Sequence, residues 1–263
     1  MADALFERDG DRFVPTELAR GPWSPNALHG GPSAALLARA AERFEGGENM
    51  LVTRVTVELL RPVPVAPLVL TAHLRRPGRK VQLIEASLSA GPTEVARATA
   101  LRIRILDLPV PPERDASAPP SGPESGRPAR PWGAPQADYP AFHNLGVEHR
   151  IVVGGFDRPG PTTDWIRLRV PVVAGESVSA LERVAAAADF GNGISWVLPR
   201  LEGWQFINPD LTIALQRHPV DEWVCLEAET MVQSSGIGLA ESRLWDRSGR
   251  LGRAVQSLLI DRD

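Results

Sequence analysis

Apolar and polar residues alternate with a period of two in four segments of the first half of the chain, the pattern of β-strands that bury one face. The positions that share a face within each segment are Val55, Val57 and Leu59; Val69, Thr71 and His73; Val81, Leu83 and Glu85; and Ala98, Ala100 and Arg102. Turn-forming residues separate the segments, as at Arg76-Pro77-Gly78 and Gly91-Pro92. The pattern predicts consecutive strands joined by hairpins in an antiparallel sheet.

The pattern returns in the second half with an offset of 156 residues, as from Thr56 to Thr212. Segments 55–103 and 211–259 align without a gap and share ten identities, where unrelated segments would share about three or four. The identities are Thr56/Thr212, Leu59/Leu215, Arg61/Arg217, Leu70/Leu226, Ala72/Ala228, Leu83/Leu239, Glu85/Glu241, Leu88/Leu244, Arg97/Arg253 and Ala98/Ala254. A long repeat that occurs twice indicates a duplicated domain. We expect the copies to pack as a pseudo-twofold pair with their sheets joined edge to edge.

An alanine-rich segment precedes the strands in each copy and predicts a helix. The first helix is expected over about 32–43, where Pro32 suits a first helical position and Gly30 and Gly31 supply the turn into it. Small side chains on a helix let strands approach it closely. We therefore predict an α+β fold with two tandem copies of an antiparallel sheet, each wrapped around a central helix.

The helix of the second copy is expected over about 178–190. Ser179 and Glu182 fit a capping box at its start, and Gly191 and Gly193 are expected to end it. Both copies thus have the same order of elements.

A proline-rich segment separates the copies. Nine prolines lie within 109–135, together with serine, glycine and glutamate, a composition that cannot build a core. The predicted organisation is a first repeat over 1–106, an extended linker over 107–140 and a second repeat over 141–263.

Composition limits the classes of partner and site. A net charge of −3 and a pI near 6.0 argue against nucleic acid or an anionic membrane as the main partner. No run of apolar residues is long enough to span a membrane, and the first residues lack a signal-peptide pattern, so we expect a cytoplasmic protein. Zinc-type Cys/His spacing, a phosphate loop, a Rossmann fingerprint and Gly-x-Ser-x-Gly are all missing from the sequence, and the single Cys225 is expected to be a buried thiol.

Asp189 is the sharpest candidate for chemistry. It lies four residues after Ala185, on the apolar stripe of the second predicted helix and near its C-terminal end. Partial burial and the negative end of the helix dipole both favour a basic carboxylate, which suits a general base. The alternative is a solvated residue beside Gly191.

Two amides distinguish the second copy from the first. Asn208 falls opposite Val52, and Gln256 falls opposite Ala100 on a strand face that points to the core. Buried amides are costly without partners, so each has either a structural role, satisfying buried backbone, or a catalytic one. We expect one apolar tunnel between the repeats, with this single polar set at its inner end.

The start of the first helix offers donors to an anion. His29 precedes Gly30 and Gly31, whose bare backbone N–H groups form a natural site for a developing oxyanion. The His29 side chain either caps the helix or points into a cleft, and capping is the simpler role.

Taken together, these motifs resemble the double-hotdog acyl-CoA thioesterases of the thioesterase II type, within them the actinobacterial branch. The likeness covers nearly the whole chain apart from the linker. It is carried by Gly30-Gly31, Leu60-Arg61-Pro62, Arg76-Pro77-Gly78-Arg79, Ala188-Asp189-Phe190, Trp223, the 236–239 turn and Val255-Gln256.

The resemblance implies direct hydrolysis of acyl-CoA to free acid and CoA, in lipid metabolism, without cofactor, metal or covalent intermediate. The catalytic trio of the family, Asp, Thr and Gln, falls on Asp189, Asn208 and Gln256, and Asp210 matches a further family Asp. Asn208 thus replaces the family Thr, and Pro32 replaces a family Gln.

The resemblance also implies that CoA phosphates bind cationic groups at the pocket mouth. Arg76 and Arg79, with Arg75 beside them, are the candidates. Two other classes stay open: a non-catalytic protein that binds acyl ligands, and, ranked lower because Asp189 has no His within a helical turn, a hotdog dehydratase. A homo-oligomer, such as a dimer of double hotdogs, also stays open.

Overall fold

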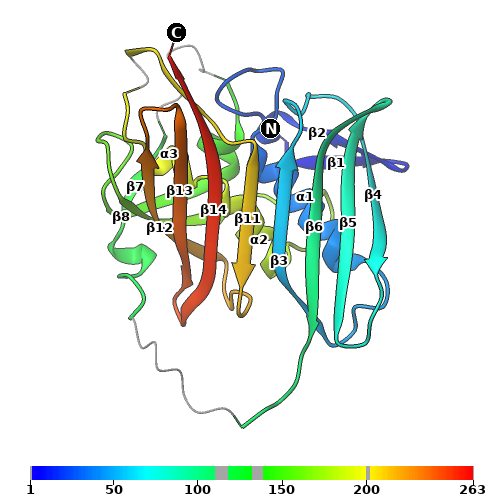
Figure 1. The fold of residues 1–263 in the computed structure, drawn as a ribbon. Helices are drawn as coiled ribbons and strands as arrows, with labels where there is room; N and C mark the ends of the chain where they lie inside the picture. Colours follow the sequence, from blue (N-terminus) through cyan, green and yellow to red (C-terminus); the bar gives the residue numbers. More distant parts are fainter. Residues whose placement is uncertain (1, 110–117, 132–138, 200–201, 263) are drawn as a thin grey trace.

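The computed structural model describes residues 2–109, 118–131, 139–199 and 202–262. Within them, fourteen strands form one antiparallel sheet, and its central strands β3, β5, β6, β11, β13 and β14 lie in front of the helices (Figure 1). The strands are β1 (Phe6–Asp9), β2 (Arg12–Pro15), β3 (Met50–Leu59), β4 (Leu68–Arg76), β5 (Val81–Ala90), β6 (Thr93–Arg104), β7 (Arg127–Ala129), β8 (Val147–Val153), β9 (Thr162–Leu168), β10 (Trp204–Ile207), β11 (Asp210–Leu215), β12 (Trp223–Val232), β13 (Ile237–Asp246) and β14 (Gly249–Arg262).

The sheet is built from two similar halves. Its strand order is β1-β2-β4-β5-β6-β3 followed by β11-β14-β13-β12-β9-β8-β7, with β10 paired to β14. Strands β3 to β6 and their counterparts β11 to β14 have the same order outward from the centre, as the repeat predicts. The expectation that hairpins join all consecutive strands is wrong for β3 and β11, which pair with β6 and β14 and not with the strands that follow them. The halves meet where β3 pairs with β11, so the predicted edge-to-edge join is confirmed. The fold is a double hotdog.

The helices lie behind the sheet (Figure 1). They are α1 (Gly30–Arg43), α2 (Ala180–Ala188) and α3 (Gly191–Ile194), with short turns of helix at Glu17–Ala19, Pro123–Ser125 and Phe142–Gly146. The buried face of α1 is rich in alanine and packs directly on β3 to β6 and on α2. Small side chains thus let the sheet wrap closely around the helix, as expected.

The ends of the helices partly differ from the predictions. α1 begins at Gly30, and His29, not Pro32, marks its start. The capping box of α2 is confirmed, because Ser179 Oγ accepts from the N–H of Glu182 and Ser179 N donates to Glu182 Oε2. The expectation that Gly191 and Gly193 end the second helix is wrong, since the chain turns at Asp189 and these glycines form α3.

Further strands come from segments that the alternation did not reveal. β1 and β2 extend the first half, and β8 and β9 extend the second, where four strands a copy were expected. Residues Arg127–Ala129 of the predicted linker form β7 on β8, and Ser121 O accepts from Trp165 Nε1 at 2.7 Å. Parts of that linker, 110–117 and 132–138, lie outside the described residues. We retain 1–106 and 141–263 as proposed limits of the repeats.

The state of Cys225 and the length of the helices can also be compared with the sequence analysis. Cys225 is buried, as predicted, and burial raises the pKa of its thiol well above the usual range. Among the described helices, none is both long and apolar enough to cross a membrane.

Candidate active site

The first turn of α1 lies directly against the last turn of α2. A Cβ atom on Gly31 would lie 2.6 Å from the carbonyl oxygen of Ala186, and one on Gly30 would lie 2.6 Å from Asp189 Oδ2. Any side chain at either position would collide with α2 or with the carboxylate. Glycine at Gly31 is therefore required for the helices to meet, whereas glycine at Gly30 leaves room for the Asp189 carboxylate, and the sequence alone revealed neither role.

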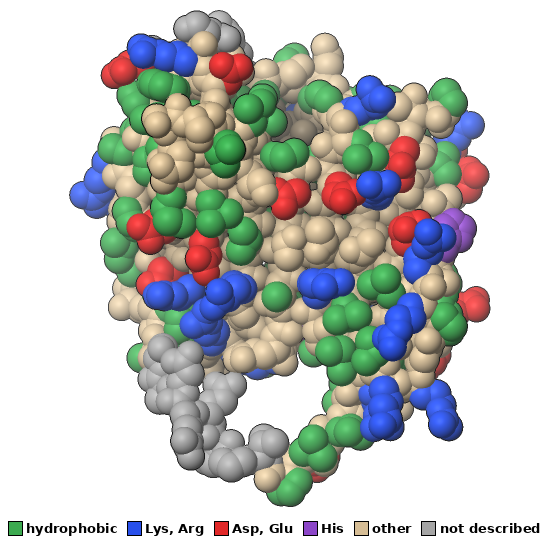
Figure 2. Space-filling view, viewed as in Figure 1, with side chains coloured by type: hydrophobic (Ala, Val, Ile, Leu, Met, Phe, Trp, Pro, Cys, Tyr) green, Lys and Arg blue, Asp and Glu red, His purple; other side chains and the backbone are tan. Residues whose placement is uncertain are grey.

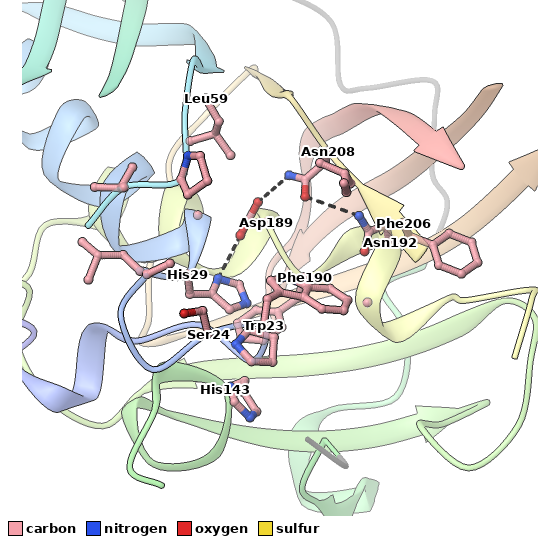
Figure 3. Close-up of a pocket in the computed structure, with 18 of the residues that line it drawn as sticks. Trp23, Ser24, His29, Leu59, His143, Asp189, Phe190, Asn192, Phe206 and Asn208 are labelled. Carbon is pink, nitrogen blue, oxygen red and sulfur yellow. Dashed lines mark hydrogen bonds and ion pairs between the residues drawn. The ribbon is translucent and has the colours of Figure 1, made fainter. Parts of the chain in front are cut away.

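Asp189 is the C-cap residue of α2, and its carboxylate is almost fully buried, with 6% of the side chain exposed. Oδ1 accepts from Asn208 Nδ2 at 2.9 Å, and Oδ2 lies 2.8 Å from His29 Nδ1 (Figure 3). Oδ1 also accepts from Gln256 Nε2 at 3.3 Å. The fold thus brings together Asp189, Asn208 and Gln256, which are up to 67 residues apart in sequence, and adds His29 from the other repeat.

His29 has two partners that compete for one ring nitrogen. Nδ1 lies 2.8 Å from Asp189 Oδ2 and 3.1 Å from the backbone N of Gly31. It carries either a proton or a lone pair, so it donates to an ionised Asp189 or accepts from Gly31, but not both. When Nδ1 donates to the carboxylate, the N–H of Gly31 has no acceptor in the cap. The capping role expected for His29 is therefore coupled to the state of Asp189.

Gln256 ties the site to the following turn. Besides its bond to the carboxylate, its Nε2 lies 3.2 Å from the backbone oxygen of Asp189, and its Oε1 accepts from the N–H of Asn192 at 3.0 Å. Only 1% of Gln256 is exposed. Both the nitrogen and the oxygen of this buried amide thus have hydrogen-bond partners, which offsets the free-energy cost of burying it. The same bonds hold the residues at the end of α2.

Asn192 is a site residue that the sequence analysis missed. Its side chain lies in the pocket, with Nδ2 3.5 Å from Asn208 Oδ1, which makes the last link of a chain from His29 through Asp189 and Asn208 (Figure 3). A polar residue three positions after Asp189, in an otherwise apolar segment, was the available signal. The expectation that Gly191 ends the helix hid it, because a residue beyond a helix end has no predictable direction.

Asp210 has a backbone role in the sheet. Its Oδ1 accepts from the N–H of Ser257 at 2.8 Å, and it pairs with Glu58 across the join of the repeats. It does not line the pocket.

Arg76 and Arg79 are placed away from the pocket. They lie at the β4–β5 hairpin, at the level of Leu101 in the sheet, whereas the pocket lies beyond the Leu59 end of β3. This is about 17 Å along the strands and three strands across, so neither guanidinium contacts the pocket mouth. The expectation that they bind a ligand there is not supported by the geometry.

The pocket has a volume of about 630 Å³ and lies between the repeats. Its walls come from 22–30 and 59–63 of the first half and from 189–196 and 205–209 of the second, and most are apolar. Figure 2 shows a hollow at the upper edge of the molecule, above the join of the two halves. His29, Asp189, Asn192 and Asn208 provide polar groups within this apolar lining.

The opposite end of the helix pair is closed by ion pairs. Arg39 near the end of α1 bonds Glu176 through Nε and Nη2 at 2.7 and 2.6 Å, and Arg43 Nη1 lies 2.9 Å from the same carboxylate. The Arg39 guanidinium is the main reason that the pKa of Glu176 is lowered. Because Val52 and Ala100 occupy the places of Asn208 and Gln256, the trio is not repeated at this end.

Comparisons with known proteins place these features in a family. A model of the acyl-CoA thioesterase N-terminal domain matches residues 19–103, and a model of the acyl-CoA thioesterase C-terminal domain matches residues 115–260. A comparison with curated proteins gave no match.

Solved structures share the fold along the whole chain. A candidate thioesterase of Novosphingobium aromaticivorans is 24% identical, with a TM-score of 0.73 and 98% of each chain covered. A candidate thioesterase II of Thermobifida fusca is 20% identical, with a TM-score of 0.72 and coverage of 99% of this chain and 96% of that one. A hot dog protein of Alicyclobacillus acidocaldarius is 20% identical, with a TM-score of 0.71 and coverage of 99% and 97%.

Proposed function

Because the chain belongs to the acyl-CoA thioesterase family, we propose that it hydrolyses acyl-CoA thioesters to free acid and CoA, with water activated by Asp189. The observation that carries the proposal is the buried Asp189 carboxylate, held by His29, Asn208 and Gln256 and lining an apolar pocket. An acyl chain is buried favourably in such a pocket, while the thioester must lie beside the polar groups. We also propose that the protein belongs to the actinobacterial branch of the thioesterase II-like enzymes.

The hydrogen bonds to Asp189 indicate which of its two carboxylate oxygens accepts the proton of the water. Each carboxylate oxygen has two acceptor sites, and those of Oδ1 are taken by Asn208 and Gln256. Oδ2 has one contact, with His29 Nδ1, so one acceptor site remains. In the proposed reaction, a water in the pocket donates to Oδ2 and is thereby oriented towards the thioester carbonyl carbon.

The reaction then needs no covalent intermediate. Water adds to the carbonyl carbon as its proton passes to Asp189, which gives a tetrahedral oxyanion. The C–S bond breaks, the acid is released, and the proton on Asp189 passes to the departing CoA thiolate. Asp189 returns to its starting state, and atoms and charge balance without a cofactor.

The start of α1 offers donors to the oxyanion. Gly30 lines the pocket, and its N–H is one of the helix-start groups that no preceding turn can bond. Gly31 has a second such N–H, which the capping contact of His29 otherwise uses. We propose that the N–H of Gly30, which lines the pocket, polarises the carbonyl, while His29 donates to the ionised Asp189.

Asn208 stands where the family has Thr, and we propose that it holds the water with an amide N–H group and not with a hydroxyl. Its Nδ2 carries two hydrogens, one directed to Asp189 Oδ1 and the other available to the water, while Oδ1 faces Asn192. The hydrogen bonds argue against a decayed site, in which buried polar groups would lose their partners.

A hotdog dehydratase is the second candidate, because the fold places His29 beside Asp189 although no histidine is near in sequence. A dehydratase needs an acid and a base that act separately on its substrate. Here His29 Nδ1 lies 2.8 Å from the carboxylate itself, so the two groups do not act separately, which favours a supporting role for His29 and hence hydrolysis.

The test is thiol release from a panel of acyl-CoAs, from acetyl to palmitoyl, with enoyl-CoA hydration measured in parallel. We expect thiol release that saturates with substrate and no hydration. Hydration without thiol release would favour the dehydratase, and tight binding without either would favour an acyl-binding protein. A cytoplasmic location and a dimer of double hotdogs remain proposals, the latter testable by light scattering.

A further inference from the structure

Arg61 and Arg217 occupy equivalent positions in the two repeats but have different surroundings. In the second repeat, Arg217 holds the buried Asp246 through Nη1 and Nη2 at 2.7 and 2.6 Å. Asp246 also accepts from the N–H groups of Val220 and Ser248. Arg217 is thus a structural clamp between the end of β11 and the β13–β14 hairpin.

The first repeat has no counterpart of this clamp. The residue equivalent to Asp246 is Ala90, 156 positions earlier, so the acidic partner is gone. Glu58, the nearest acid along β3, is bonded to Arg97. Within the part of the chain that the structure describes, the exposed side chain of Arg61 has no ion pair, whereas its backbone is fixed by a bond from Arg61 N to Val95 O at 3.2 Å.

Arg61 lines the pocket. Arg61 is a lining residue together with Trp23 and Leu60, both of which are exposed, so this wall is the outer part of the pocket. Among the described lining residues, Arg61 is the single lysine or arginine, and Asp189, the single carboxylate, is buried further in. The pocket therefore has its positive charge at the mouth and its negative charge inside.

We propose that Arg61 is an anion site that binds a phosphate of the substrate's CoA, an inference that rests on the proposed function. With the thioester at Asp189 and the acyl chain in the apolar pocket, the CoA must leave through the mouth and carry its phosphates past Arg61. The planar guanidinium matches a phosphate with two parallel N–H bonds. Since Ala90 stands where the second repeat has Asp246, the arginine that is a structural clamp in the second repeat has no acidic partner of this kind in the first and can bind a ligand.

The test compares Arg61→Ala with the wild-type enzyme on two substrates that carry the same acyl group. One is the acyl-CoA, and the other is the S-acyl-N-acetylcysteamine thioester, which has no phosphate. We expect KM for the acyl-CoA to rise about tenfold at unchanged kcat, as for the loss of one charge-assisted hydrogen bond, and no change on the phosphate-free thioester. Arg104→Ala, which removes an exposed arginine of β6 at the far end of the sheet, is the matched control and leaves both substrates unchanged.

Two further arms separate the sources of the phosphate and the two proposals. The KM for acyl-dephospho-CoA, which lacks the 3′-phosphate, is measured for the wild type and for Arg61→Ala. If the substitution no longer raises this KM, the 3′-phosphate is the ligand; if it still raises this KM, the diphosphate is the ligand. An Arg61→Ala variant with unchanged KM, or with equal losses on both substrates, overturns the anion site. If the wild-type protein hydrolyses no thioester, the proposed function fails, and calorimetry with CoA itself decides whether Arg61→Ala weakens binding.

Discussion

Thr56 and Thr212 face each other across the centre of the sheet, where Thr212 Oγ1 donates to Thr56 Oγ1 over 3.3 Å. They are equivalent residues of the two repeats, and they are also direct partners in the pairing of β3 with β11. The neighbouring pair Glu58↔Asp210 maps onto Arg54↔Ala214 under the same offset. The pseudo-twofold axis therefore passes between the two threonines.

The join can be tested with charges at these two positions. Like charges directly opposite each other destabilise a sheet, and opposite charges stabilise it, by about 0.2–1 kcal/mol each. We expect T56K/T212K to unfold at a lower free energy than T56K/T212E, by about 1 kcal/mol at low salt and less at high salt. Denaturant unfolding of both double variants and of the single variants measures the coupling; equal stabilities would contradict the pairing.

Gly30 and Gly31 should fail in different ways when each is changed to alanine. At Gly30 the new Cβ meets the carboxylate of Asp189, the end of a side chain, which can move. At Gly31 it meets the backbone oxygen of Ala186, which cannot move without separating the helices. We expect Gly30→Ala to lose activity at nearly unchanged melting temperature and Gly31→Ala to lose about 1–3 kcal/mol of stability. Thermal melts and thioesterase assays on both variants check this; the reverse pattern would show that the helix contact is misassigned.

Gln256→Ala should affect both stability and activity. The change leaves the buried N–H of Asn192 without its acceptor and removes a donor from Asp189. We expect the free energy of unfolding to fall by about 1–3 kcal/mol and the turnover to fall about tenfold, less than for loss of the base. Parallel unfolding and kinetic measurements test this, and a stable variant with full activity would remove Gln256 from the site.

Asp246 makes stability depend on pH through its clamp with Arg217. Burial alone would raise the pKa of Asp246, but bonds from Arg217 and from the N–H groups of Val220 and Ser248 outweigh it, so the pKa is lowered. The folded state therefore gains stability above about pH 4, and this gain is lost as the pH falls through the lowered pKa. We expect wild type to be more stable than Asp246→Asn near neutral pH, with a gap that narrows below about pH 4. A gap independent of pH in urea unfolding would contradict this.

Strands β3 to β6 and β11 to β14 could be predicted because they alternate and repeat at a fixed spacing. The offset that relates Thr56 in β3 to Thr212 in β11 also relates Leu88 in β5 to Leu244 in β13. β1 and β2 could not be predicted, since each has four residues and too few alternations to form a pattern. β7 was hidden by the prolines around it, although a strand at the edge of a sheet tolerates proline.

Candidate residues of the site could be predicted in each repeat, but the contact between the repeats could not. Asn208 and Gln256 stand out because they replace apolar residues of the first copy, and Asp189 stands out because it lies on the apolar stripe of a predicted helix. His29 comes from the first repeat, and a contact between two repeats depends on how the helices pack, which the periodicity does not contain. Arg76 and Arg79 were expected at the mouth for their charge alone, but which end of a strand faces a pocket is set by the topology of the sheet.

The most direct test of the account is hydrolysis of acyl-CoA by Asp189→Asn. The amide keeps the shape of the carboxylate and most of its hydrogen bonds but cannot accept the proton of the water. We predict that turnover falls by about 10²–10⁴-fold while the melting temperature stays within a few degrees of wild type. Full activity in a folded Asp189→Asn protein would contradict the assignment of Asp189 as the base.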